Sequence, residues 1–181
     1  MKSDCPRNAC QRPWHPVPEF TAPTAAIIAA VSDVWRQADA RAAEVGAECR
    51  ACGSCCDFPR RGHVLFGAGL EMDVLAAWAA ANRSLDGDQA ASALGSLRCP
   101  FWRQGRCSVR PVRLLGCRVY FCDNRAAQWL HEVCEDGLRQ LDALCAQHGR
   151  PRWYGPALEY LERNMSHLIC SARLDKGDVS T

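Results

Sequence analysis

The sequence predicts a mainly α protein, a small helical body with two cysteine-rich metal-binding loops and little or no β-structure. Three observations lead to this fold class. Apolar residues recur at helical spacing in several separate stretches. Of the 13 cysteines, eight fall in two blocks. Hydrophobic residues make up 48% and charged residues 23% of the 181 positions, which is ordinary for one globular domain with a core.

The same composition excludes several classes of protein. No run approaches the about 18 consecutive apolar residues that a membrane span needs, so no membrane association is expected. The formal net charge of +2 is too small to indicate a nucleic-acid or membrane partner by itself. The first residues lack the apolar core of a secretory signal, which predicts a cytoplasmic protein with reduced thiols. Because the cysteine number is also odd, metal ligation is preferred over a disulfide scaffold.

Proline and glycine positions divide the chain. Five prolines within the first 23 positions predict an irregular arm over residues 1–23. Residues 24–170 are expected to form a single α-rich domain that carries the cysteine cluster over 49–123, and residues 171–181 a flexible tail. Within the domain, Thr24 is a candidate N-cap for a helix that runs to about Val45 and stops at Gly46.

The remaining elements follow from the same patterns. Further helices are expected at Leu70–Asn82, at Gln89–Leu97, from about Trp129 to Leu144, and at about Pro156–Leu168. Three segments are expected to be non-helical: His63–Phe66 as a short extended piece, Cys99–Cys107 as a tight loop, and Leu114–Phe121 as a short strand or an extended ligand loop.

The first cysteine block is a C-x2-C-x2-C-C run made by Cys49, Cys52, Cys55 and Cys56. Thiolates two residues apart let a loop curl around one centre, and Gly53 permits the positive φ that such curling needs. Ferredoxin-type loops hold three corners of a cubane cluster with this spacing. Structural zinc sites usually split their ligands into two distant pairs. The spacing therefore favours Cys49, Cys52 and Cys55 as three corners of a cluster.

The second cysteine block must supply the fourth ligand or most of a second site. Its members are Cys99, Cys107, Cys117 and Cys122. Eight cysteines fit two four-thiolate sites as well as one cluster with additional structural thiols. The number of sites therefore stays open.

Arginines crowd the second block. Seven lie between Ser96 and Arg125, against Asp123 as the single acid: Arg98, Arg103, Arg106, Arg110, Arg113, Arg118 and Arg125. A four-thiolate zinc or oxidised cubane centre carries a formal charge of about −2, which guanidinium groups would offset while donating hydrogen bonds to sulfur. Arg98, Arg113 and Arg118 are our candidate cofactor-binding residues. A solvated basic face and a surface for an anionic substrate or RNA are the alternatives.

At these residues the chain resembles the CxxCxxCC family, also called YkgJ-type cysteine cluster proteins. The match runs from about Cys49 to Cys122 and includes three later motifs: Cys99-Pro100-Phe101, Cys107-Ser108-Val109 and Cys117-Arg118. Arg110 stands where the family often has Tyr, and Leu114 where it usually has Pro. The family is named for suspected zinc or iron binding, so the resemblance implies metal chelation and no particular reaction. Related clusters in flagellin lysine-methylase-like proteins keep an enzymatic role open.

The sequence thus favours a protein that holds an iron–sulfur cluster, 4Fe–4S in type, with redox or cluster-dependent catalysis as an extension. Two alternatives stay open: a structural zinc module for protein or nucleic-acid interaction, and a methylase-like or redox enzyme component. The expected partner is an unidentified protein or an anionic small molecule. Cys134 and Cys145 are interpreted as small core residues. Cys5, Cys10 and His15 are a weaker candidate for a second site.

Overall fold

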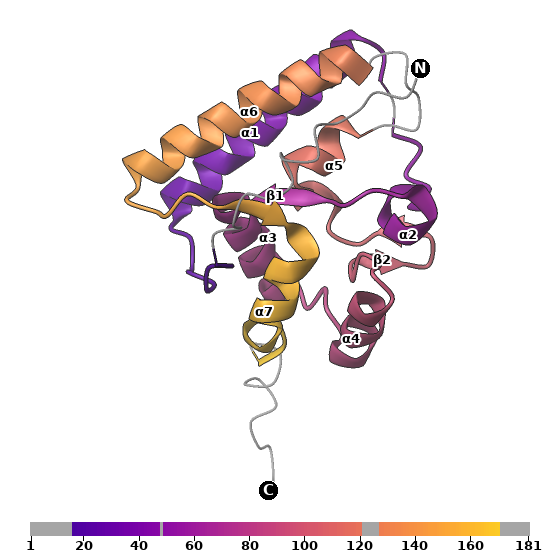
Figure 1. Ribbon diagram of the computed structural model, residues 1–181. Helices are drawn as coiled ribbons and strands as arrows, with labels where there is room; N and C mark the ends of the chain where they lie inside the picture. The colour runs from indigo at the N-terminus through magenta and orange to yellow at the C-terminus, as the bar shows by residue number, and fades with distance from the viewer. Residues whose placement is uncertain (1–15, 48, 121–126, 171–181) are drawn as a thin grey trace, which may run out of the picture.

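A computed structural model of the chain describes residues 16–47, 49–120 and 127–170. Its helices make up most of the body, and Figure 1 shows them around a short central strand. The helices are α1 (Ala25–Glu44), α2 (Phe58–Arg61), α3 (Gly69–Ala81), α4 (Gly87–Gly95), α5 (Leu115–Val119), α6 (Ala127–Gln147) and α7 (Ala157–Cys170). Two 3-10 turns, η2 (Ser54–Cys56) and η3 (Arg110–Val112), lie in the cysteine region. The predicted mainly helical fold class is confirmed.

The strands of the described residues form two small antiparallel pairs. Strand β1 (Phe66–Ala68) pairs with β4 (Tyr154–Pro156) and so links the chain before α3 to the start of α7. Strand β2 (Trp102–Arg103) pairs with β3 (Arg106–Cys107) in a hairpin. The candidate residues Cys5, Cys10, His15, Cys122 and Arg125 lie outside the described residues, as does the tail 171–181.

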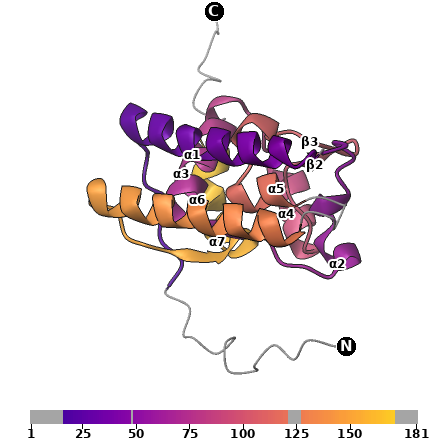
Figure 2. The same cartoon turned by 90° about the horizontal axis from the view of Figure 1, so that it is seen from above.

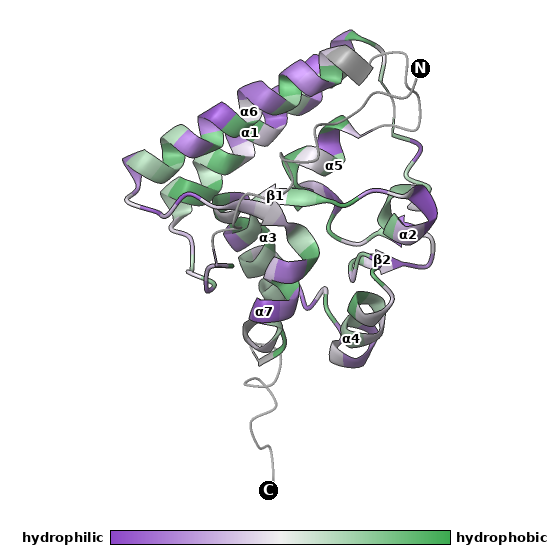
Figure 3. Ribbon diagram, viewed as in Figure 1, coloured by the Kyte–Doolittle hydropathy of each residue, from purple (hydrophilic) through white to green (hydrophobic). Residues whose placement is uncertain are grey.

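Helix α1 begins and ends where local sequence signals place it. The Thr24 hydroxyl accepts a hydrogen bond from the Ile27 N–H at 3.3 Å, which satisfies one of the free donors of the first turn. The helix ends at Glu44, and Gly46 follows with a φ of +65°. Figures 1 and 2 both show α1 beside α6, and in Figure 3 both helices alternate hydrophobic and hydrophilic residues. Each thus buries one face against its neighbours.

Helix α3 is the centre of the core. It is apolar on nearly all sides, and its buried residues are Gly69, Leu70, Glu71, Met72, Asp73, Val74, Leu75, Ala76 and Ala79. Both of its buried acids, Glu71 and Asp73, accept several hydrogen bonds. The Glu71 carboxylate accepts hydrogen bonds from Trp35 Nε1 of α1 at 3.0 Å, from the Ala68 N–H at 3.0 Å and from the Leu115 N–H at 2.7 Å. Glu71 therefore joins α1, α3 and α5 at one point.

The second buried acid, Asp73, helps to hold the described part of the N-terminal arm. The Thr21 N–H donates to Asp73 at 3.2 Å, and Arg150 forms an ion pair with the same carboxylate at 2.7 Å. Asn164 of α7 accepts from the Phe20 N–H at 2.7 Å and donates to the Pro18 carbonyl at 3.1 Å. Irregular residues 16–24 are thus tied to α3 and α7 by buried polar groups.

The segment Leu114–Phe121 differs from the prediction. Instead of a strand or an extended loop, its residues Leu115–Val119 form helix α5. The Leu115 N–H at the start of the helix donates to Glu71, a partner 44 residues away in sequence. This contact satisfies a donor that a helix start leaves free, so a distant carboxylate outweighs the β propensity of the segment.

Candidate metal centre

Six of the predicted metal ligands line one narrow cavity of about 50 Å³, the cysteine cavity. They are Cys49, Cys55, Cys56, Cys99, Cys107 and Cys117, and all are free thiols. They come from the segment formed by η2 and the loop before it, from the residues after α4, from strand β3 and from helix α5. Among the described residues, no His, Asp or Glu lines this cavity. Sulfur is therefore the side-chain atom that could ligate a metal there.

The first cysteine loop depends on Gly53. Its φ of +66° lies in the left-handed region, as the sequence predicts. An added Cβ would lie 2.4 Å from Trp102 Nε1 and 2.7 Å from the Gly105 carbonyl oxygen. The Gly53 backbone therefore packs directly against the β2–β3 hairpin, with no room for a side chain. The Cys56 N–H donates to the Gly53 carbonyl at 2.9 Å and closes the turn that presents Cys55 and Cys56.

Backbone hydrogen bonds join the two cysteine blocks. The Cys99 N–H donates to the Cys56 carbonyl at 3.0 Å. The expected tight loop is the β2–β3 hairpin, whose two central residues Gln104 and Gly105 have φ values of +49° and +76°. Two positive φ values are typical of a type I′ turn, which matches the twist of the paired strands. The hairpin thereby brings Cys107 back beside the first block.

Two arginines contact the cavity through Cys49. Arg110 Nη1 and Arg113 Nη1 each lie 3.5 Å from Cys49 Sγ. Burial alone would raise the pKa of Cys49, but the Arg110 hydrogen bond, the Ala51 backbone and the two positive charges together lower that pKa. The two arginines therefore favour the thiolate form of Cys49. Arg113 is one of the predicted cofactor-binding residues, whereas Arg110 is not.

The other thiols disfavour ionisation in one another. The pKa of Cys55 is raised by its hydrogen bond with Cys56 and by burial. The Cys55 hydrogen bond lowers the pKa of Cys56, but Cys99 and burial outweigh it and leave that pKa raised. Burial, followed by charge interactions with neighbouring cysteines, raises the pKa of Cys117. Several thiolates can coexist here only with a compensating cation, so metal binding would release protons.

The structure places the two other candidate arginines away from the cysteine cavity. Arg118 is buried, and it donates to the Arg113 carbonyl at 2.8 Å, to the Pro111 carbonyl at 2.7 Å and to Asp39. Its guanidinium also lies over the Trp35 ring, 5.0 Å from the centroid. Arg98 Nε lies 3.4 Å from Asp57. Neither residue lines the cavity, so Arg118 holds the η3–α5 segment in place and Arg98 pairs with a nearby acid.

Cys52 does not line the cysteine cavity. Its side chain is exposed, it lines neither this cavity nor the one described next, and its Sγ lies 3.4 Å from Ser54 Oγ. The structure therefore brings together Cys49 and Cys55 of the predicted three-corner set, and adds Cys56, Cys99, Cys107 and Cys117. Within the described ranges, no three or more Cys, His, Asp or Glu side chains are grouped in a way that could hold a metal ion.

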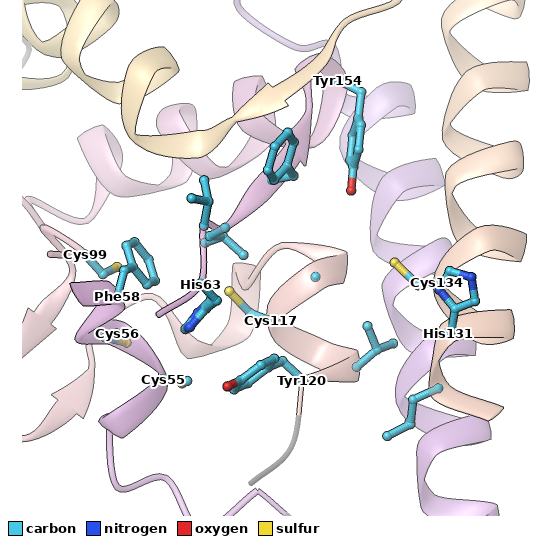
Figure 4. Close-up of a pocket in the computed structure, with 16 residues that line it drawn as sticks. Cys55, Cys56, Phe58, His63, Cys99, Cys117, Tyr120, His131, Cys134 and Tyr154 are labelled. Carbon is cyan, nitrogen blue, oxygen red and sulfur yellow. The ribbon is translucent and has the colours of Figure 1, made fainter. Parts of the chain in front are cut away.

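A wider cavity of about 380 Å³, the lateral cavity, adjoins the cysteine cavity. Cys55, Cys56, Cys99 and Cys117 line both. Figure 4 shows Cys55, Cys56 and Cys99 on one side, His131 and Cys134 of α6 on the other, and Cys117 between them. Sequence reasoning missed this cavity, because its walls come from segments whose proximity no local pattern signals.

The fold and the site together define a small helical protein with a thiol-lined cavity at the junction of its loops. The chain matches no family model, no curated protein and no solved structure. The resemblance to the CxxCxxCC family therefore stays a prediction. Of the helices in the described ranges, none combines the length and apolar character needed to cross a membrane.

Proposed function

We propose that this protein binds an iron–sulfur cluster, 4Fe–4S in type, through thiolates of the cysteine cavity. The observation that carries the proposal is the convergence of six free thiols from four separate segments on one small cavity. Six thiols on one cavity would give a metal more than the four sulfur ligands that a cubane or zinc needs. In the cytoplasm, where we place the protein, these thiols would stay reduced and available.

The donor set suits such a group. Thiolates are the ligands of iron–sulfur clusters and of many zinc sites. The cavity of about 50 Å³ exceeds the roughly 10–15 Å³ that one water-sized sphere occupies, so it has room for a bound species between the thiols. The Arg110 and Arg113 guanidinium groups would offset the negative charge and donate to sulfur. When bound, a cluster of this kind supplies one-electron transfer or an open iron site.

Cysteine substitutions test the ligand set. Cys117→Ser should lower the bound iron to less than about half, because it removes one of the six thiols that line the cavity. Cys145→Ser is the matched control, since Cys145 is buried in α6 but lines neither cavity. Cys52→Ser is expected to retain iron. Bound iron that is unchanged in Cys117→Ser, or lost in Cys52→Ser alone, would overturn the assignment to the cysteine cavity.

Metal identity decides between the cluster and the zinc module. A colourless protein that holds zinc in stoichiometric amount, and loses it in Cys117→Ser, would contradict the cluster and support a structural zinc site in the same cavity. Normal folding without any metal would contradict both. The helical signal in circular dichroism, measured on each variant, separates loss of ligand from loss of fold.

A further inference from the structure

Among the described residues, the walls of the lateral cavity carry no acidic or basic side chains apart from two histidines. The 16 lining residues include no Asp, Glu, Lys or Arg, although these make up 23% of the chain. The volume of about 380 Å³ falls in the range of small-molecule sites. Among the described residues a charged molecule would find no Asp, Glu, Lys or Arg counter-ion here, so these walls favour a neutral occupant.

Exposed apolar residues gather at this cavity. Six large hydrophobic residues are exposed among the described residues, and three of them line the lateral cavity: Val64 at 62%, Tyr120 at 39% and Tyr154 at 48% exposure. Exposed apolar groups that cluster at one concave place indicate a binding surface, whereas isolated ones need no explanation. This clustering is independent of the cysteines and points to an apolar ligand.

The side walls of the cavity are flat aromatic rings. His63 and Tyr120 stack with their centroids 4.7 Å apart and their planes at 19°, and Phe58 meets His63 edge to face at 5.1 Å. Phe66 and Tyr154 form a second aromatic pair at 5.5 Å. Figure 4 shows Tyr120 and Tyr154 on different sides of the cavity, with Cys117 between them. Ring faces on two sides suit a planar molecule.

A polar atom of the walls could fix the orientation of such a molecule. The Tyr154 side chain lines the lateral cavity and carries a hydroxyl group. Burial raises the pKa of Tyr154 to about 12, so its hydroxyl stays neutral and can donate. The neutral Tyr154 hydroxyl could therefore hydrogen-bond to a hydroxyl or carbonyl oxygen of a bound molecule.

We propose that the lateral cavity binds a neutral, planar, mainly apolar molecule that carries a hydroxyl or carbonyl oxygen, such as a phenol or a quinone. The bound molecule would contact the wall formed by Cys55, Cys56, Cys99 and Cys117, which the two cavities share. Contact with a metal centre rests on the proposed function, whereas binding of the molecule does not.

A titration with 2-naphthol, a neutral planar phenol, tests the proposal on the protein as purified under anaerobic conditions. We expect saturable binding of one molecule per chain, followed by naphthol fluorescence. Naphthalene-2-sulfonate has the same ring system with a permanent charge, and it should bind about tenfold more weakly or less. Equal affinity for the two compounds, or no saturable binding of 2-naphthol, would overturn the proposal.

Substitutions locate the bound naphthol. Tyr120→Ala removes a ring face and should weaken binding about fivefold. Val64→Asp changes a residue that is 62% exposed, so the fold is expected to persist, and its charge at the cavity should weaken binding about threefold. Ile28→Ala, at an exposed position on α1, is the control and should bind normally. If both Tyr120→Ala and Val64→Asp bind like the parent, the site lies elsewhere.

Alkylation of Cys134 gives a second readout. Cys134 lines the lateral cavity and is not a predicted metal ligand, so 2-naphthol should slow its modification by N-ethylmaleimide while the sulfonate should not. Iron determined in the same samples separates the two proposals. Naphthol binding without bound iron would support the ligand site and contradict the iron–sulfur cluster. Bound iron without naphthol binding would support the cluster and contradict the ligand site.

Discussion

Removal of the Glu71 carboxylate should cost a large part of the stability of the fold. Glu71 is 1% exposed and accepts three hydrogen bonds, from Trp35 Nε1, the Ala68 N–H and the Leu115 N–H. In Glu71→Ala all three donors lose their acceptor, and an unsatisfied buried donor costs about 1–3 kcal/mol. Partial access of water to the new space reduces the sum. We expect a loss of about 4 kcal/mol, against a total of about 5–15 kcal/mol for a typical domain.

Glu71→Gln separates the loss of hydrogen bonds from the loss of volume. The amide oxygen can still accept from Trp35 and Leu115, while the amide nitrogen would face the Ala68 N–H as a second donor. One contact is lost, so a loss of about 1–2 kcal/mol is expected.

Urea unfolding followed by circular dichroism measures both losses, with Glu162→Ala, an exposed acid on α7, as the control. If Glu71→Ala stays within about 1 kcal/mol of the parent, Glu71 does not join the three helices as described.

Three further predictions concern the core, the cysteine loop and the arginines. Burial and the hydrogen bond to Asp73 raise the pKa of Tyr160. The neutral Tyr160 hydroxyl therefore stabilises the fold fully below the ordinary tyrosine pKa, and this stabilisation is lost as pH rises above it. Unfolding curves should show this alkaline loss of stability in the parent and a smaller loss in Tyr160→Phe. Gly53→Ala combines a positive φ with a Cβ 2.4 Å from Trp102 Nε1, and should cost about 2 kcal/mol together with most of the bound metal, whereas Gly95→Ala, where an added Cβ meets open space, should change neither. Arg118→Met should lower the free energy of unfolding by about 3 kcal/mol, because buried hydrogen bonds are lost. Arg113→Met should weaken metal retention and have a smaller effect on unfolding. Equal effects of the two substitutions on metal content would contradict the roles assigned to these arginines.

Local signals predicted the elements that local contacts determine. The Thr24 cap bonds to a residue three positions on, so the start of α1 could be read from the sequence. The positive φ of Gly53 could also be predicted, because a loop that curls through closely spaced cysteines needs such a position and glycine adopts it without strain. The helical form of α5 could not, since its first N–H bonds to Glu71, 44 residues away.

The composition of the candidate site was predicted more completely than its geometry. The spacing C-x2-C-x2-C treats Cys52 as equivalent to Cys49 and Cys55, yet the positive φ of Ala51 and Gly53 leads the backbone of this loop through two left-handed positions. Cys52 stays exposed as a result, while the η2 turn presents Cys56. Arg118 has the charge expected of a cofactor-binding residue, but its partner Asp39 is 79 residues away. Contacts over such separations leave no periodic trace in the sequence.

Iron and acid-labile sulfide, determined together with the visible spectrum after anaerobic purification, test the central claim most directly. The account predicts a brown protein with iron and sulfide in near-equal amounts, about four of each per chain for one cubane. A colourless protein without iron and sulfide, whether it holds zinc or no metal, would contradict it.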